Sequence, residues 1–100
     1  MNFQQKVLSL VKKIPKGKIT TYKIIGKKLG RRGQIYRAVG RALHDNIYPI
    51  KIPCHRVVKS TGEIGGYSRG IKKKIFLLKK EGVQIKKNKI INFKEKLFRF

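Results

Sequence analysis

The sequence predicts a mainly α-helical protein: a single small domain that contains a helix-turn-helix and a short hairpin. Apolar residues recur at helical spacing in four segments, and the two middle segments are joined by a tight glycine-containing turn. A chain of 100 residues has room for one hydrophobic core, and a hydrophobic content of 40% is enough to build it.

The first helix is expected from Phe3 to Ile14, where the apolar residues form one stripe. Asn2 precedes it as a candidate N-cap, and Pro15 ends it because proline cannot continue a helix.

The helix-turn-helix is expected over residues 21–44. Its first helix covers about 21–29 and opens with Thr21, whose side chain can cap a helix N-terminus. The second covers about 34–44 and carries an apolar face made of Ile35, Val39, Ala42 and Leu43.

Beyond residue 46 the pattern becomes extended. Two prolines within 47–53 favour a stiff, extended approach to Cys54. Residues 56–59 and 63–64 are expected to form the hairpin, and 71–81 the last helix. The tail from residue 83 fits either a docked extended segment or a short helix.

The formal charge of +23, from 27 basic and 4 acidic residues, indicates a polyanionic partner. Nucleic acid is the favoured partner; an anionic membrane surface and a solvated basic face without a partner are the alternatives. No apolar run is long enough to cross a bilayer, and no secretion signal is recognised, so a cytoplasmic location is expected, or a nuclear one in a eukaryote. The short basic runs 72–74 and 86–87 are interpreted as solvated faces.

Cys54 is the candidate nucleophile, because a basic surrounding favours a thiolate; a buried structural cysteine is the alternative. His55 follows it, but neighbouring side chains in an extended stretch point to opposite sides, so His55 acts through a water or simply packs. One cysteine cannot form an internal disulfide. One cysteine and two histidines also provide fewer than the four ligands that structural zinc needs. We therefore expect no metal and no cofactor.

The stretch Ile-Pro-Cys-His-Arg-Val-Val at 52–58 resembles the active-site signature of the O6-alkylguanine-DNA alkyltransferases (methylated-DNA–protein-cysteine methyltransferases). The similarity extends over about residues 3–83. Further matches in order and spacing are Tyr22, Arg37-Ala38-Val39-Gly40, Asn46, Pro49, residues 65–68 and Lys80-Glu81-Gly82.

This resemblance implies a winged-helix-like C-terminal alkyltransferase domain over 1–85, followed by a basic and aromatic tail over 86–100. It implies DNA repair by irreversible, single-turnover transfer of an alkyl group from O6-alkylguanine to the protein's own cysteine. The partner would be double-stranded DNA, entered from the minor groove by a monomer, with the damaged nucleotide flipped out of the stack.

By the same resemblance, Cys54 accepts the alkyl group, His55 deprotonates it through a water, and Glu81 orients His55. Asn46 braces the active-site turn, and Tyr22 assists at the phosphate and hydrogen-bonds the guanine ring. Arg37 replaces the flipped base on a DNA face that also includes Tyr36, Ala38 and Gly40. The substrate pocket comprises Val57, Tyr67, Ser68, Pro49 and Leu43.

The chain departs from this family at Tyr36, where a small residue is usual, and in its Lys/Phe-rich tail; the N-terminal domain of many members is also expected to be missing. Related alkyltransferase-like proteins carry tryptophan at the cysteine position and bind damage without removing it. Cys54 favours an active transferase over a non-catalytic damage-recognition or architectural DNA-binding protein. A cysteine hydrolase is a weaker third reading, because Cys54 and His55 are adjacent.

Overall fold

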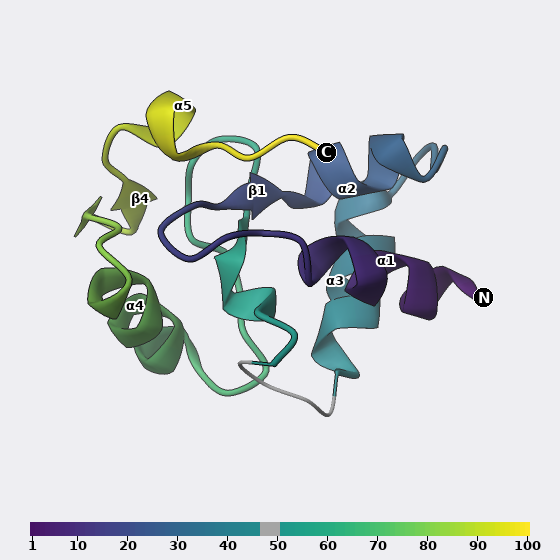
Figure 1. Ribbon diagram of the computed structural model, residues 1–100, viewed down its shortest axis with the longest axis horizontal. Coiled ribbons are helices and arrows are strands. Elements are labelled where there is room, and N and C mark those ends of the chain that lie inside the picture. Colours follow the sequence, from purple (N-terminus) through teal and green to yellow (C-terminus); the bar gives the residue numbers. More distant parts are fainter. Residues whose placement is uncertain (47–50) are drawn as a thin grey trace.

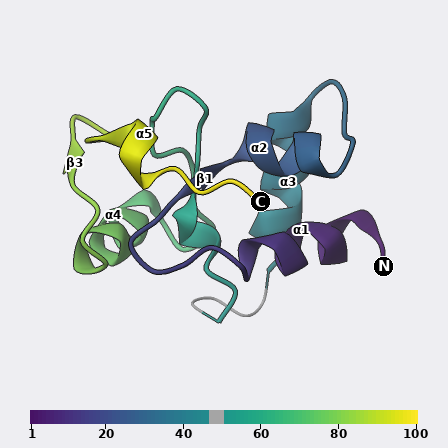
Figure 2. The ribbon, with the colours of Figure 1, turned by 45° about the horizontal axis from the view of Figure 1, so that its top comes forward.

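The computed structural model describes residues 1–46 and 51–100 (Figure 1). Three helices pack together at one end of the molecule, and a fourth lies with the C-terminal elements at the other (Figures 1 and 2). The mainly α-helical prediction is confirmed. The elements are α1 (Phe3–Val11), β1 (Thr20–Thr21), α2 (Tyr22–Lys28), α3 (Ile35–His44), the 3-10 turn η1 (Cys54–Arg56), β2 (Val57–Val58), α4 (Ile71–Lys80), β3 (Ile85–Lys86), β4 (Lys89–Ile90) and α5 (Phe93–Lys96).

Asn2 caps α1 as predicted. Its side chain accepts a hydrogen bond from the Gln5 backbone, and the Gln5 side chain accepts one from the Asn2 backbone, which completes a capping box. The helix ends at Val11 rather than near Ile14. The last turn tightens before Pro15, because a residue that precedes proline is driven out of the α region.

The predicted helix-turn-helix is formed by α2 and α3, which make the most extensive helix–helix contact among the described residues. Thr21 Oγ1 accepts a hydrogen bond from the Ile24 N–H and caps α2. A Cβ atom at Gly26 would lie 2.2 Å from the Ile35 side chain, so only glycine permits this close approach.

The predicted hairpin is closed at its turn by a hydrogen bond from the Lys59 N–H to the Glu63 carbonyl (2.9 Å). Its pairing differs from the expectation. Arg56 belongs to η1, and β2 pairs in parallel with β1 instead of with its own return strand. Glu63, in the return segment, forms an antiparallel bridge with Lys89 in the tail.

Two apolar clusters form the core. The first joins α1, α2, α3 and Cys54, and the second joins Ile19, Val58, Leu78 and Ile90. The tail contains both of the expected alternatives, the short helix α5 and an extended end that runs beside Ile19, and it adds an antiparallel hairpin of β3 and β4 that was not predicted. Within the described residues no helix is long and apolar enough to span a membrane.

Candidate active site around Cys54

Cys54 and His55 lie on the 3-10 turn η1, so the expected extended run through Cys54 is wrong at this point. Pro53 precedes the turn with a φ of −78°, a value that starts a helical turn as readily as a strand. The Arg56 N–H closes the turn on the Pro53 carbonyl (2.9 Å). The side chains of Cys54 and His55 are almost fully buried, with 6% and 1% of their surface exposed.

Asn46 reaches the Cys54 thiol from the end of α3. Its Nδ2 lies 3.6 Å from the Sγ and donates a hydrogen bond to the Ile52 carbonyl (3.2 Å). The side chain therefore ties the helix-turn-helix to the segment that enters η1.

Glu81, just after α4, holds both His55 and Arg56. The His55 Nε2 lies 3.1 Å from Oε1, and the Arg56 guanidinium binds both carboxylate oxygens. Burial by itself would raise the pKa of Glu81, but the hydrogen bonds and charges of its two partners outweigh burial and lower it. Glu81 is therefore a carboxylate at neutral pH.

His55 is neutral at neutral pH, because burial and the charges of Arg56 and Lys74 together lower the pKa of its ring, although the Glu81 carboxylate opposes this shift. A neutral ring facing a carboxylate carries its proton on the nitrogen that donates to it, here Nε2. The other nitrogen, Nδ1, is then the proton acceptor. It is buried and makes no hydrogen bond within the described part of the protein.

A cavity of about 190 Å³ opens beside the thiol. Four elements converge on it: α2, α3, η1 and the loop before α4. The lining residues are Tyr22, Tyr36, Gly40, Leu43, His44, Cys54, Gly66, Tyr67 and Ser68.

Most of the residues expected at the pocket or on the DNA face meet at this cavity, but three of the described ones do not line it. Val57 is fully buried in the core. Arg37 is exposed on α3 and Ala38 is partly exposed. Pro49 lies outside the described residues. His44 lines the cavity without having been predicted, because its place depends on how α3 packs, and Gly66, one of the matched residues 65–68, lines it as well.

The buried Tyr22 and the partly buried Tyr67 keep their protons at this site. Burial, with the nearby Tyr36 and Cys54, raises the pKa of Tyr22. Burial also raises the pKa of Tyr67, together with the charge of Cys54 and a hydrogen bond to it. Both hydroxyls therefore remain hydrogen-bond donors at neutral pH.

Tyr36 is 45% exposed and packs edge-on against Tyr22, with ring centroids 4.5 Å apart. The pair separates the Cys54 cavity from a larger one of about 460 Å³, which Lys59 and Glu63 help to line. That larger cavity contains no cysteine or histidine. A bulky residue at position 36 thus forms a wall between two cavities.

Lys74 was missed, and its interpretation as part of a solvated basic run is wrong. It is completely buried on α4, and its Nζ donates to the carbonyls of Val57 (2.7 Å) and Gly66 (3.0 Å). The ammonium lies 5.8 Å from the centroid of the Tyr22 ring. Burial lowers the pKa of Lys74 from 10.5 to about 7, although the nearby Cys54 opposes this shift.

A signal for Lys74 exists in the sequence. It shares the helical stripe of Ile71, Ile75 and Leu78, at spacings of three and four residues. The second missed residue, Arg56, carries no comparable signal. Its salt bridge joins η1 to the end of α4, which are 25 residues apart.

The family model for the DNA-binding domain of 6-O-methylguanine DNA methyltransferase matches residues 2–83. A methylated-DNA–protein-cysteine methyltransferase of Saccharolobus islandicus is 52% identical over 83 residues, which are 83% of this chain and 52% of that protein. The chain therefore spans about half the length of the curated relatives it matches.

Two solved structures are similar over much of the chain. O6-methylguanine-DNA methyltransferase from Pyrococcus kodakaraensis is 45% identical with a TM-score of 0.73, covering 83% of this chain and 47% of that one. S. pombe Atl1, in complex with damaged DNA containing O6-carboxymethylguanine, is 30% identical with a TM-score of 0.82. That match covers 98% of this chain and 95% of Atl1.

Proposed function

Because the chain belongs to the family of the 6-O-methylguanine DNA methyltransferase DNA-binding domain, we propose that it repairs O6-alkylguanine in duplex DNA by transferring the alkyl group to Cys54. The observation that carries this proposal is the Cys54 thiol, which lines a cavity beside a neutral histidine paired with a carboxylate. Transfer breaks the bond between O6 and the alkyl carbon and forms a bond between that carbon and Sγ. The products are guanine and a thioether, so each molecule acts once.

His55 generates the nucleophile. Its unprotonated Nδ1 takes the thiol proton of Cys54 through a water. The Nε2–H meanwhile continues to donate its hydrogen bond to the Glu81 carboxylate. The Glu81 carboxylate then stabilises the protonated ring. Arg56 keeps Glu81 charged and fixed in place, which makes it a positioning residue for this step.

Tyr22 assists the leaving base. As guanine loses its alkyl group it departs as an anion, which a hydrogen bond to the ring stabilises. The raised pKa of Tyr22 keeps its proton on the hydroxyl, so Tyr22 can donate that bond at neutral pH.

A base that remains stacked in a duplex cannot reach a buried thiol, so the nucleotide must be flipped into the cavity. Arg37 projects from α3, the second helix of the helix-turn-helix, and is exposed next to the cavity-lining Tyr36. We assign Arg37 to the space that the flipped base leaves, with α3 in the minor groove.

The test is an intact-mass measurement after the protein meets a duplex that contains one O6-methylguanine. We expect a single gain equal to one methyl group less one hydrogen, localised to the peptide that contains Cys54. A protein that binds this duplex but gains no mass would instead be a damage-recognition protein. That second function is favoured by the near full-length match to Atl1 bound to damaged DNA.

Replacing Arg37 with alanine should slow methyl transfer from the duplex much more than transfer from the free base O6-methylguanine. Only the duplex requires flipping, so only that rate depends on Arg37. Single-turnover rates on both substrates measure the difference, with Arg32→Ala as an exposed control in the turn before α3. Equal losses on both substrates would contradict the flipping role.

A further inference from the structure

The C-terminal end of the tail lies beside α2 (Figures 1 and 2), where backbone hydrogen bonds join it to Ile19. The Ile19 N–H donates to the Lys96 carbonyl (2.9 Å), and the Phe98 N–H donates to the Ile19 carbonyl (2.7 Å). Phe98 and Phe100 pack against the first core cluster, whereas Arg99 between them is exposed. This alternation fixes the Arg99 backbone while leaving its guanidinium at the surface.

A groove of about 260 Å³ lies between the tail, α2 and the turn after β2. We call it the tail groove. Every charged residue that lines it is basic. The lining residues are Thr21, Lys23, Ile24, Lys27, Ser60, Phe93, Leu97 and Arg99.

The three basic residues of the tail groove are not neutralised within the described residues. Lys23 and Lys27 are one helical turn apart on α2, so their charges repel each other. The ion pairs of the described residues lie elsewhere, at Asp45 and Glu81, and none includes Lys23, Lys27 or Arg99. Together with the hydroxyls of Thr21 and Ser60, the groove offers donors and positive charge without an acceptor carboxylate.

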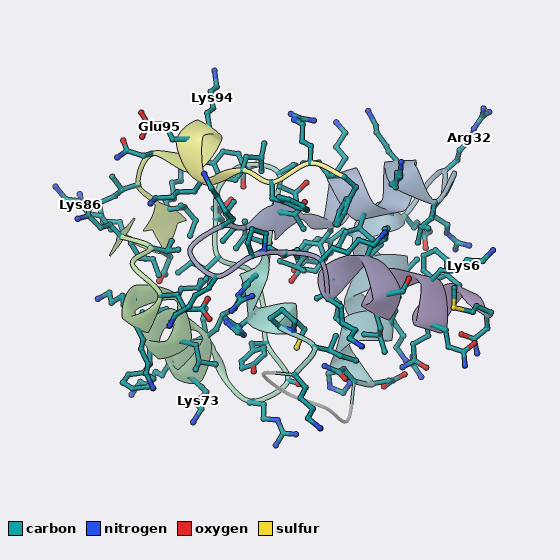
Figure 3. All side chains as sticks on the ribbon, viewed as in Figure 1. Lys6, Arg32, Lys73, Lys86, Lys94 and Glu95 are labelled. Carbon is teal, nitrogen blue, oxygen red and sulfur yellow. The ribbon has the colours of Figure 1, made fainter. Side chains whose placement is uncertain are left out.

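The tail groove is linked to the Cys54 cavity through the larger cavity between them. The groove shares Lys23 and Ser60 with the larger cavity, which shares Tyr22 and Tyr36 with the Cys54 cavity. A duplex that extends from the Cys54 cavity over the start of α2 would therefore reach the groove. The net charge of the protein alone does not identify the tail groove as a DNA-binding surface, because the labelled basic side chains in Figure 3 project from several sides of the molecule.

We propose that the tail groove binds a backbone phosphate of the DNA, which makes the C-terminal tail part of the DNA-binding surface. The match to the family model ends at residue 83, so it includes Lys23 and Lys27 but not Arg99, which the tail adds to the groove. The inference rests on the proposed function, since it takes duplex DNA as the partner. Phosphate neutralisation by Lys and Arg releases counterions, which gives the contact a measurable signature in salt dependence.

The experiment compares the double variant Lys27→Gln/Arg99→Gln with the wild-type protein. Affinity for an undamaged duplex is measured by fluorescence anisotropy over a range of salt concentrations. If the groove holds one phosphate, the slope of log affinity against log salt becomes shallower by about 0.9. The matched control is the double variant Lys72→Gln/Lys73→Gln, because both lysines are exposed on α4. This control removes the same number of positive charges as the groove variant.

Equal changes in slope for the two double variants would overturn the proposal, because a general loss of charge would then explain the effect. An unchanged slope in the groove variant would overturn it as well. Transfer from free O6-methylguanine to Cys54, which involves no phosphate, is measured in parallel and should be unaffected by the groove variant. A wild-type protein that binds duplex but transfers no methyl group would contradict the proposed transfer while leaving the groove result intact. A wild-type protein that binds no duplex would overturn both proposals.

Discussion

Replacing Cys54 with serine should abolish methyl transfer while leaving duplex binding intact. A serine hydroxyl ionises far less readily than a thiol, so neutral His55 cannot convert it to a competent nucleophile. The two side chains are similar in size, and the Asn46 Nδ2 that contacts the Sγ can donate to a hydroxyl instead. The intact mass after incubation with methylated duplex should therefore stay constant.

Duplex affinity of the Cys54→Ser variant provides the control, measured by anisotropy on the same damaged oligonucleotide. Retained affinity with no mass gain separates chemistry from recognition. A mass gain that survives this substitution would place the acceptor at another residue and contradict the assignment of Cys54. Loss of both transfer and binding, with an intact fold, would show that the thiol contributes to recognition as well as to transfer.

Replacing Lys74 with methionine should remove a rise in stability that the wild-type protein shows above neutral pH. Below pH 7 both the native and the unfolded chain carry the Lys74 proton, so this residue adds no pH dependence. Between about 7 and 10.5 the unfolded chain keeps the proton and the native one has lost it, so stability rises with pH. The expected contribution is about 1.4 kcal/mol for each pH unit.

Chemical denaturation at several pH values between 6 and about 10 measures this slope. Lys73→Met is the matched control, because Lys73 is exposed and adjacent on α4. Both variants lose one basic residue, so the change in overall charge repulsion cancels between them. A slope in the Lys74→Met variant equal to that of the control would show that Lys74 is not buried in its neutral form.

The helix-turn-helix could be predicted because its signals are local. The apolar stripe on α3, the Thr21 cap and the tight turn all lie within a few residues of what they determine. The parallel pairing of β1 with β2 could not be predicted, since it joins Thr20 to Val57 across 37 residues. No spacing rule in the sequence links two such short strands.

The candidate site divides in the same way. The signature around Cys54 and the matching Tyr22, Asn46 and Glu81 identify residues one by one. Their distances arise only when α3, η1 and α4 pack. The exposure of a lysine likewise depends on packing. The run of three lysines at 72–74 therefore did not indicate that Lys74 is buried.

The sequence by itself determined the helical elements, the family resemblance and the choice of Cys54 as candidate nucleophile, because each follows from residue type and short-range spacing. Tertiary structure decided the protonation of the site. His55 is neutral and Glu81 charged because burial and a long-range salt bridge from Arg56 act on them together. It also decided that Arg99, near the end of the chain, lines the same groove as Lys27, since only folding brings the two segments together.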